Sequence, residues 1–285
     1  MIEPILYLKR HLTSFQIMIL GFAGVILLGA LVLMLPIATV QRVWTPFHEA
    51  LFTSTSAVCV TGLVVQDTGS YWSAFGQTVI LLLIQIGGLG VITGAVTFLM
   101  LAGRNITLKE RSAMQDAISA PAVGGIVRLT RFILKGTFLV ELLGALALLP
   151  AFCRDYGLRG VWMSVFHSVS AFCNAGFDLF GRFGQYSSLA PYVSNYYVQA
   201  VIMFLIMAGG LGFMVWVEIG EWRKKRHLSL HARMVLLFSC ILWVGGAVLI
   251  GLMEWNNPKS MGGLSVPGKV MAALFQSVST PTAGM

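Results

Sequence analysis

Five long apolar stretches constrain the fold of this 285-residue chain more than any other feature. They lie at residues 15–37, 75–101, 132–152, 196–217 and 235–253, between charged or Pro/Gly-containing connections. A helix needs roughly 20 mostly apolar residues to cross the hydrocarbon core of a bilayer. The first stretch is too long for the apolar core of a cleaved signal peptide, so we interpret it as a retained helix. The sequence therefore predicts an all-α polytopic membrane protein.

The basic residues predict the orientation of the chain. With the N-terminus inside, most of the 19 lysines and arginines fall in cytoplasmic segments, including the run at 223–226. The outer segments contain only Arg42, Arg154, Arg159, Arg182, Lys259 and Lys269. This asymmetry follows the positive-inside rule. We therefore expect a multi-pass protein with a cytoplasmic N-terminus, and we attribute the net charge of +8 to topology and contact with lipid, not to nucleic-acid binding.

An internal repeat lies between the apolar stretches. The segments FTSTSAVCVTGL at 52–63, FHSVSAFCNAGF at 166–177 and FQSVSTPTAGM at 275–285 share an initial Phe, paired Ser or Thr residues and a late Gly. Gln77 and the run GGLG at 87–90 recur, at one constant offset, as Gln199 and the run at 209–212. Each segment is too short to span and is flanked on both sides by outer connections, so it must enter and leave the membrane on one side. We predict helix, pore loop, helix units at 1–115 and 116–233 and the start of a third at 234–285.

The loop at the end of each short segment has the composition of a cation filter. Short helices are predicted at 44–58, 160–172 and 268–278, and their carboxyl ends carry partial negative charge that favours a cation. Backbone carbonyls of converging loops can replace the water of a monovalent cation, and glycine allows the backbone angles that this requires. The candidate ion-binding residues are Cys59, Val60, Thr61 and Gly62; Cys173, Asn174, Ala175 and Gly176; and Pro281, Thr282, Ala283 and Gly284.

These segments, together with the two GGLG runs and the terminal SVSTPTAG, resemble the Trk/Ktr/HKT superfamily of potassium transporters, most closely the bacterial Ktr/Trk-type pore-forming subunit. The resemblance covers essentially the whole chain. It implies potassium uptake across the cell (inner) membrane, in some members coupled to sodium, by a homodimer with a cytoplasmic nucleotide-binding subunit of the RCK/KTN type. Glycine in the filter loops is associated with potassium in this family, and serine in the first loop with sodium, so Gly62 favours potassium.

The resemblance also implies four units around a pseudo-fourfold pore in one polypeptide. This sequence holds three of the expected four, and the third has no closing helix. We therefore expect a C-terminally truncated, incomplete pore that has no cofactor of its own.

Three other functions are compatible with parts of this pattern. The first is a sodium-permeable or sodium-coupled transporter of the same superfamily. The second is an alternating-access carrier with broken helices, although units of one orientation favour an axial pore. The third is an intramembrane enzyme, but the spans contain no paired acids or histidine motif that would form a catalytic site, so no enzyme is predicted.

Several residues near the predicted loops allow two interpretations each. The GGLG runs suit close helix packing more than ion contact. Glu141 is either an ion or proton site or a structural partner of a polar group on a neighbouring helix. Asp67 and Asp178 either gather cations at the outer mouth or are solvated loop carboxylates. Asn174 either tunes ion affinity or bonds a neighbouring loop.

The remaining candidates for metal or redox chemistry have weaker support. The four cysteines show no metal-binding or disulfide spacing, and we interpret Cys153 and Cys240 as buried apolar residues. His48 and Glu49 have no second histidine at metal spacing, so we expect them to anchor the chain at the membrane interface.

Overall fold

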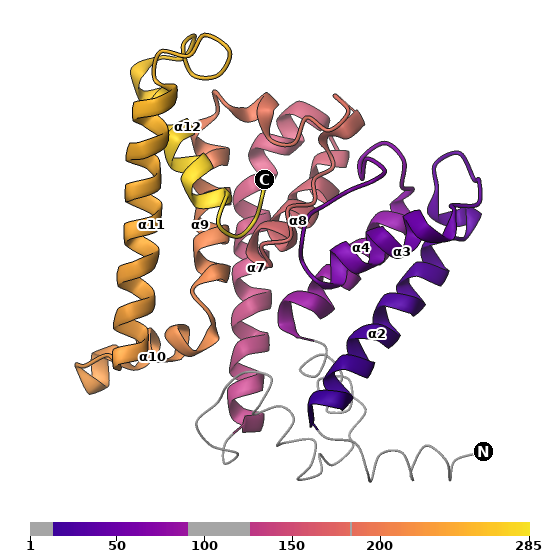
Figure 1. Cartoon of the computed structure of the whole chain (residues 1–285), viewed down its shortest axis with the longest axis horizontal. Helices are drawn as coiled ribbons and strands as arrows, with labels where there is room; N and C mark the ends of the chain where they lie inside the picture. The colour runs from indigo at the N-terminus through magenta and orange to yellow at the C-terminus, as the bar shows by residue number, and fades with distance from the viewer. Residues whose placement is uncertain (1–13, 91–125, 183) are drawn as a thin grey trace.

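The computed structural model describes residues 14–90, 126–182 and 184–285 (Figure 1). Residues 91–101 of the second predicted span, the basic residues at 104, 109 and 111, and the predicted boundary between 115 and 116 lie outside the described residues. Within the described part the fold is helical, and the one strand-like feature is an isolated bridge between Thr39 and Trp72.

The helices fall into three consecutive sets, each with a long outer helix followed by a short one. The first set is α2 (Ser14–Leu33), α3 (Phe47–Val58) and α4 (Ala74–Leu89). The second is α7 (Ile126–Tyr156), α8 (Arg159–Phe172) and α9 (Tyr196–Gly210). After α10 (Phe213–Lys225) come α11 (Leu230–Glu254) and α12 (Val266–Ser279). Short 3-10 turns lie at Pro36–Ala38, Phe180–Arg182 and Ala190–Tyr192.

Local capping explains where many of these helices begin. The side chains of Ser73, Asn195, Ser229 and Ser265 each accept a hydrogen bond from a backbone N–H in the first turn that follows, which satisfies a donor that the helix itself cannot. The short helices were predicted at 44–58, 160–172 and 268–278, and α3, α8 and α12 confirm them with bounds that differ by one to three residues at the first helix end and less than that elsewhere, apart from two residues at the start of α12.

Two of the five predicted spans are single helices of sufficient length and apolarity, Leu129–Tyr156 with 28 residues and Leu230–Glu254 with 25. The prediction of one helix over 196–217 is wrong, because α9 and α10 meet at an angle of 97°. Gly212 has φ +81 at this break, a backbone angle that ends a right-handed helix and that glycine adopts without a steric cost. The indole Nε1 of Trp216 donates to the Ala208 carbonyl at 2.9 Å and holds the bend.

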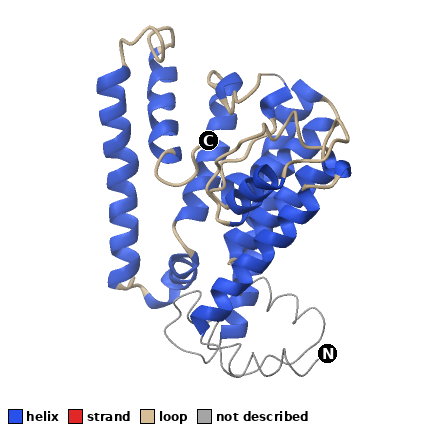
Figure 2. Ribbon diagram, turned by 45° about the vertical axis from the view of Figure 1, so that its right-hand side comes forward, coloured by secondary structure: helices blue, strands red, loops and turns tan. Residues whose placement is uncertain are grey.

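The short helices lie inside the protein and the long ones lie outside. Nearly every residue of α8 from Met163 to Phe172 is buried, and its neighbours include α7, α9 and α4. By contrast, α11 stands at one edge of the molecule in both views, with only α12 packed along it (Figures 1 and 2). The chain ends near the middle, beside α12 and the filter-like loops (Figure 1).

Candidate functional site: three re-entrant loops

Each short helix is attached to the long helix before it by one serine. The hydroxyl donates to a backbone carbonyl in three equivalent pairs: Ser54 to Ile26 at 2.7 Å, Ser168 to Glu141 at 2.6 Å and Ser277 to Trp243 at 2.8 Å. Three residues after each accepting carbonyl the long helix has a glycine, at Gly29, Gly144 and Gly246, where a side chain would collide with that hydroxyl. Glycine therefore lets the two helices approach closely enough for the bond.

A second buried serine in each short helix holds the loop that follows. The carbonyls of these serines accept bonds from the loop backbone: Ser56 from Thr61 at 2.9 Å, Ser170 from Ala175 at 2.8 Å and Ser279 from Ala283 at 2.8 Å. Their hydroxyls bind the same loops, because Ser170 donates to Phe177 O at 2.7 Å, Ser279 donates to Met285 O at 2.8 Å and Thr61 Oγ1 donates to Ser56 Oγ at 2.9 Å. The three loops are thus folded back onto their own helices in one way.

The first two loops share one backbone conformation. Cys59 and Cys173 end their helices, Val60 and Asn174 follow with φ +56 each, and Gly62 and Gly176 have φ +75 and +72. The third loop is shorter by one residue between its Phe and its Gly. It ends at Gly284 with φ +64, and neither Pro281 nor Thr282 has a positive φ.

The structure brings the three predicted loops together. A side chain on Gly62 would lie 2.7 Å from Ala175 O, and one on Gly176 would collide with Ala283 O. The carbonyl before each later glycine therefore lies against the glycine of the preceding loop, in the order first, second, third. Ala175 and Ala283 are buried, whereas Cys59, Pro281 and Thr282 are exposed.

The two GGLG runs pack against these loops from behind, as the packing interpretation predicted. A side chain on Gly87 would collide with Val58 O, and one on Gly209 would collide with Phe172 O. These carbonyls belong to the last residues of α3 and α8. Their contact with the loops is therefore structural.

Asn174 bonds the end of α9. With its amide turned so that both ends have partners, the nitrogen donates to Ile206 O and the oxygen accepts from Gly210 N, both at 3.1 Å. The side chain thus satisfies backbone groups just before the bend at Leu211 and Gly212. This geometry supports the structural alternative for Asn174.

Glu141 also has a structural partner. Its side chain is 5% exposed within α7, and Cys173 Sγ donates to its Oε1 at 3.9 Å. Because Cys173 is the first residue of the second loop, the carboxyl group lies directly behind that loop. Of the two interpretations, the structure favours pairing with a polar group.

The two aspartates after the loops differ in environment. Asp67 is 4% exposed and accepts bonds from Ser70 N and Oγ at 2.9 Å and from Tyr186 N at 3.0 Å, so it is neither solvated nor free at the mouth. It joins the segment after the first loop to the segment after the second. Asp178 is half-buried and accepts from Phe180 N at 2.9 Å. Burial raises the pKa of Asp178 to about 6, and the charge of Asp67 raises it further against that hydrogen bond.

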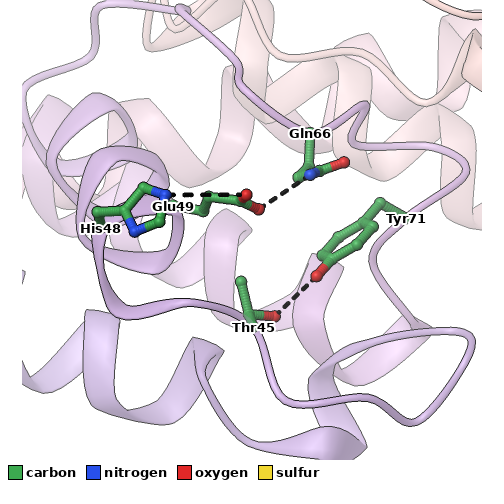
Figure 3. Close-up of polar contacts among 5 residues, drawn as sticks. All are labelled: Thr45, His48, Glu49, Gln66 and Tyr71. Carbon is green, nitrogen blue, oxygen red and sulfur yellow. Dashed lines mark hydrogen bonds and ion pairs between the residues drawn. The ribbon is translucent and has the colours of Figure 1, made fainter.

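The beginning of α3 holds the segment after the first loop in place (Figure 3). Gln66 Nε2 donates to Glu49 Oε2 at 2.9 Å, and the hydroxyls of Thr45 and Tyr71 are 3.1 Å apart. His48 Nε2 lies 4.0 Å from Glu49 Oε1, but the His48 side chain is 83% exposed. Glu49 therefore anchors a loop of its own unit, a role that the sequence analysis did not find.

Sequence analysis also missed His167. This residue is fully buried, its Nδ1 is 2.8 Å from Met163 O, and its Nε2 accepts from Leu179 N at 3.3 Å. One nitrogen must donate and the other accept, so the ring is neutral with its proton on Nδ1. Its position in FHSVSAF, directly after the repeated Phe166, was the available signal.

All four cysteines are free thiols. The interpretation of Cys240 as buried is wrong: it is exposed, because it lies on the outward face of α11, and Cys153 is only partly buried. Cys59, in the first loop, is exposed as well.

The sequence comparisons agree with this arrangement of loops. The sequence model of the TrkH family, described as "Cation transport protein", matches residues 9–285. The chain belongs to the TrkH family. This TrkH-family chain is 40% identical over 270 residues to the Ktr system potassium uptake protein B of Bacillus subtilis, which covers 94% of the chain and 59% of that protein.

Two further relatives of this TrkH-family chain are of similar extent. It is 36% identical over 277 residues to the potassium/sodium uptake protein NtpJ of Enterococcus hirae, covering 97% of the chain and 60% of that protein. It is 36% identical over 272 residues to the Ktr system potassium uptake protein B of Vibrio alginolyticus, covering 94% of the chain and 58% of that protein. The chain thus spans about three fifths of the length of these relatives.

Proposed function

We propose that this chain belongs to the translocating subunit of a Trk/Ktr-type system for potassium uptake, and that its three re-entrant loops contribute to the selectivity filter. The ion-binding groups would be mainly backbone carbonyls of residues 59–62, 173–176 and 281–284. Support comes from the names of relatives 36–40% identical over nearly the whole chain and from the geometry of the loops.

The observation that carries this proposal is the contact between successive loops. Gly62 lies against Ala175 O, and Gly176 lies against Ala283 O, so three chain segments of like fold lie around one place. Each loop follows the carboxyl end of a short helix, where the helix dipole favours a cation. A potassium ion needs closely spaced carbonyl oxygens in place of its hydration water, and loops held by backbone bonds to Ser56, Ser170 and Ser279 can keep such oxygens in place.

Potassium is the favoured ion because Gly62 occupies the position that the superfamily resemblance associates with potassium. A sodium-coupled or sodium-permeable transporter is the second candidate, since the Enterococcus hirae relative is named a potassium/sodium uptake protein. An alternating-access carrier is less favoured, because the serine-to-helix contact has the same sense in all three sets of helices and inverted repeats would reverse it.

The proposal extends to organisation and partners. The units would be 1–115, 116–233 and 234–285, in the cell membrane with the N-terminus in the cytoplasm, as the positive-inside rule favours. The subunit would form a homodimer and bind a cytoplasmic nucleotide-binding subunit of the RCK/KTN type. The run of basic residues at 223–226 would then lie on the cytoplasmic side.

A chimaera tests the function. The matching 59% of the Bacillus subtilis relative is replaced by this chain, and the product is expressed in cells that lack potassium uptake systems. We expect growth at limiting potassium, with the unmodified relative as the positive control. A chimaera that reaches the membrane in equal amount but supports no growth would contradict the proposal.

A further inference from the structure

A groove of about 680 Å³ lies between α11 and α12. The side chains that line it are apolar along most of its length, and Trp255 and Asn256 lie at one end. Its lining residues include Ala247, Val248, Gly251, Leu252, Ala273 and Trp255.

Comparison of the three helix sets explains why the groove is present only here among them. The long helices align on the glycine that contacts the serine of the short helix, at Gly29, Gly144 and Gly246. Five residues further on, α2 has Met34 and α7 has Leu149, whereas α11 has Gly251. A Cβ on Gly251 would meet only Ala273 Cβ, at 3.9 Å. The groove is therefore the space that a long side chain fills in the other two sets.

The groove opens toward the bilayer. The spanning helix α11 has only 6% of its apolar window buried inside the protein, and Val248 and Leu252 on its groove side are 55% and 77% exposed. Lipid chains must cover these side chains in a membrane. An acyl chain gains no hydrophobic free energy by moving from other lipid to this groove, because lipid tails are as apolar as leucine. Any preference among lipids must therefore come from the head group.

A basic residue stands at the Trp255 end of the groove. Lys269 Nζ donates to Trp255 O at 2.7 Å and lies 5.3 Å from the centre of the Trp255 ring. An ammonium group has three donors, so two remain for a phosphate. Glu254, the nearest acid in sequence, is held by Asn257 and Ser260 and lines a different pocket. Lysine and tryptophan are also the residues that mark the membrane interface.

We propose that this groove is a binding site for an anionic phospholipid, with one acyl chain along Gly251 and the phosphate at Lys269. The charge of Lys269 gives the site its preference for an anionic head group over a zwitterionic one. A lysine near the membrane surface favours an anionic lipid by about fivefold. The site depends on the membrane fold alone, so it stands or fails independently of the proposed transport function.

Spin-labelled lipids test the site directly. The 285-residue chain is reconstituted in phosphatidylcholine vesicles, and the immobilised fraction of spin-labelled phosphatidylglycerol is compared with that of spin-labelled phosphatidylcholine. We expect phosphatidylglycerol to be preferred, and we expect K269Q to lower that preference about fivefold at this site. G251L, which restores the filled groove of the other sets, is expected to remove the immobilised lipid that shows the preference.

Matched variants separate this site from general effects. K259Q removes an exposed lysine of the same connection, and Gly245→Leu adds the same side chain on α11 where the added Cβ meets nothing within 4 Å; both are expected to keep the preference. G251A, whose Cβ makes only an ordinary contact, covers the case in which G251L does not fold, and it is expected to weaken lipid immobilisation. An equal loss in K259Q and K269Q, an unchanged preference in the folded Gly251 variants, or a change in dimerisation of G251L without a change in lipid preference would each overturn the proposal.

Discussion

Alanine at the three loop glycines should destabilise the chain to different degrees. Gly62, Gly176 and Gly284 all have positive φ, so alanine costs about 1–2 kcal/mol at each for the left-handed backbone alone. A Cβ on Gly284 meets nothing within 4 Å, whereas one on Gly62 lies 2.7 Å from Ala175 O and one on Gly176 collides with Ala283 O. The neighbouring atoms are backbone, which cannot move aside as a flexible side chain can. We expect G284A to lose about 1–2 kcal/mol and the other two variants to lose more, with G176A the worst.

Thermal unfolding of the three purified variants in one detergent, each compared with the parent chain, measures this ranking. The difference between G284A and the other two isolates the contact between loops, because the backbone cost is common to all three. A Tm that falls equally in all three variants would refute the inference that the loops touch at Gly62 and Gly176. A larger fall for G284A than for G176A would refute it more strongly.

Three further changes have defined expectations. V60N should raise Tm, with a gain of up to about 1 kcal/mol, because Val60 has the same φ of +56 as its counterpart Asn174 and asparagine tolerates that region better than a β-branched residue; no rise would mean that the packing of Val60 outweighs its strain. Because the folded-state pKa of Asp178 is raised to about 6, its contribution favours the folded state at low pH and is lost as the pH rises from about 4 through 6, so D178N should flatten Tm against pH over that range; a parallel curve would contradict this. Ser170→Ala removes the 2.7 Å bond to Phe177 O and should cost about 1–3 kcal/mol, measured by the same unfolding assay, and an unchanged Tm would count against the serine as a loop anchor.

The short helices and their loops could be predicted from sequence because they repeat. Three copies of a Phe, paired Ser or Thr and Gly pattern gave the register of α3, α8 and α12 and placed the left-handed residues at Gly62, Gly176 and Gly284. The close packing of the GGLG runs was also predictable, since small residues at helical spacing leave room only for a backbone.

Contacts between distant segments could not be predicted in the same way. The serine pattern was visible, but the partner carbonyl of Ser54 lies in another helix, and its matching glycine, Gly29, is one small residue among many in an apolar stretch. Asp67 looked like an exposed loop acid, because nothing local reveals that Tyr186 N binds it from another unit. The break after α9 was missed because hydropathy is continuous through 196–217 and does not report a backbone angle such as that of Gly212.

Ion selectivity tests the central claim most directly. The chimaera with the Bacillus subtilis relative, with Gly62 and with G62S, is reconstituted in liposomes, and the ratio of potassium to sodium flux is measured in each. Because Gly62 lies against the carbonyl of Ala175, a side chain there should disturb two loops of the filter at once. We predict that the Gly62 form prefers potassium and that G62S loses much of this preference while remaining folded. An equal flux ratio in the two folded proteins would contradict the assignment of these loops as the filter.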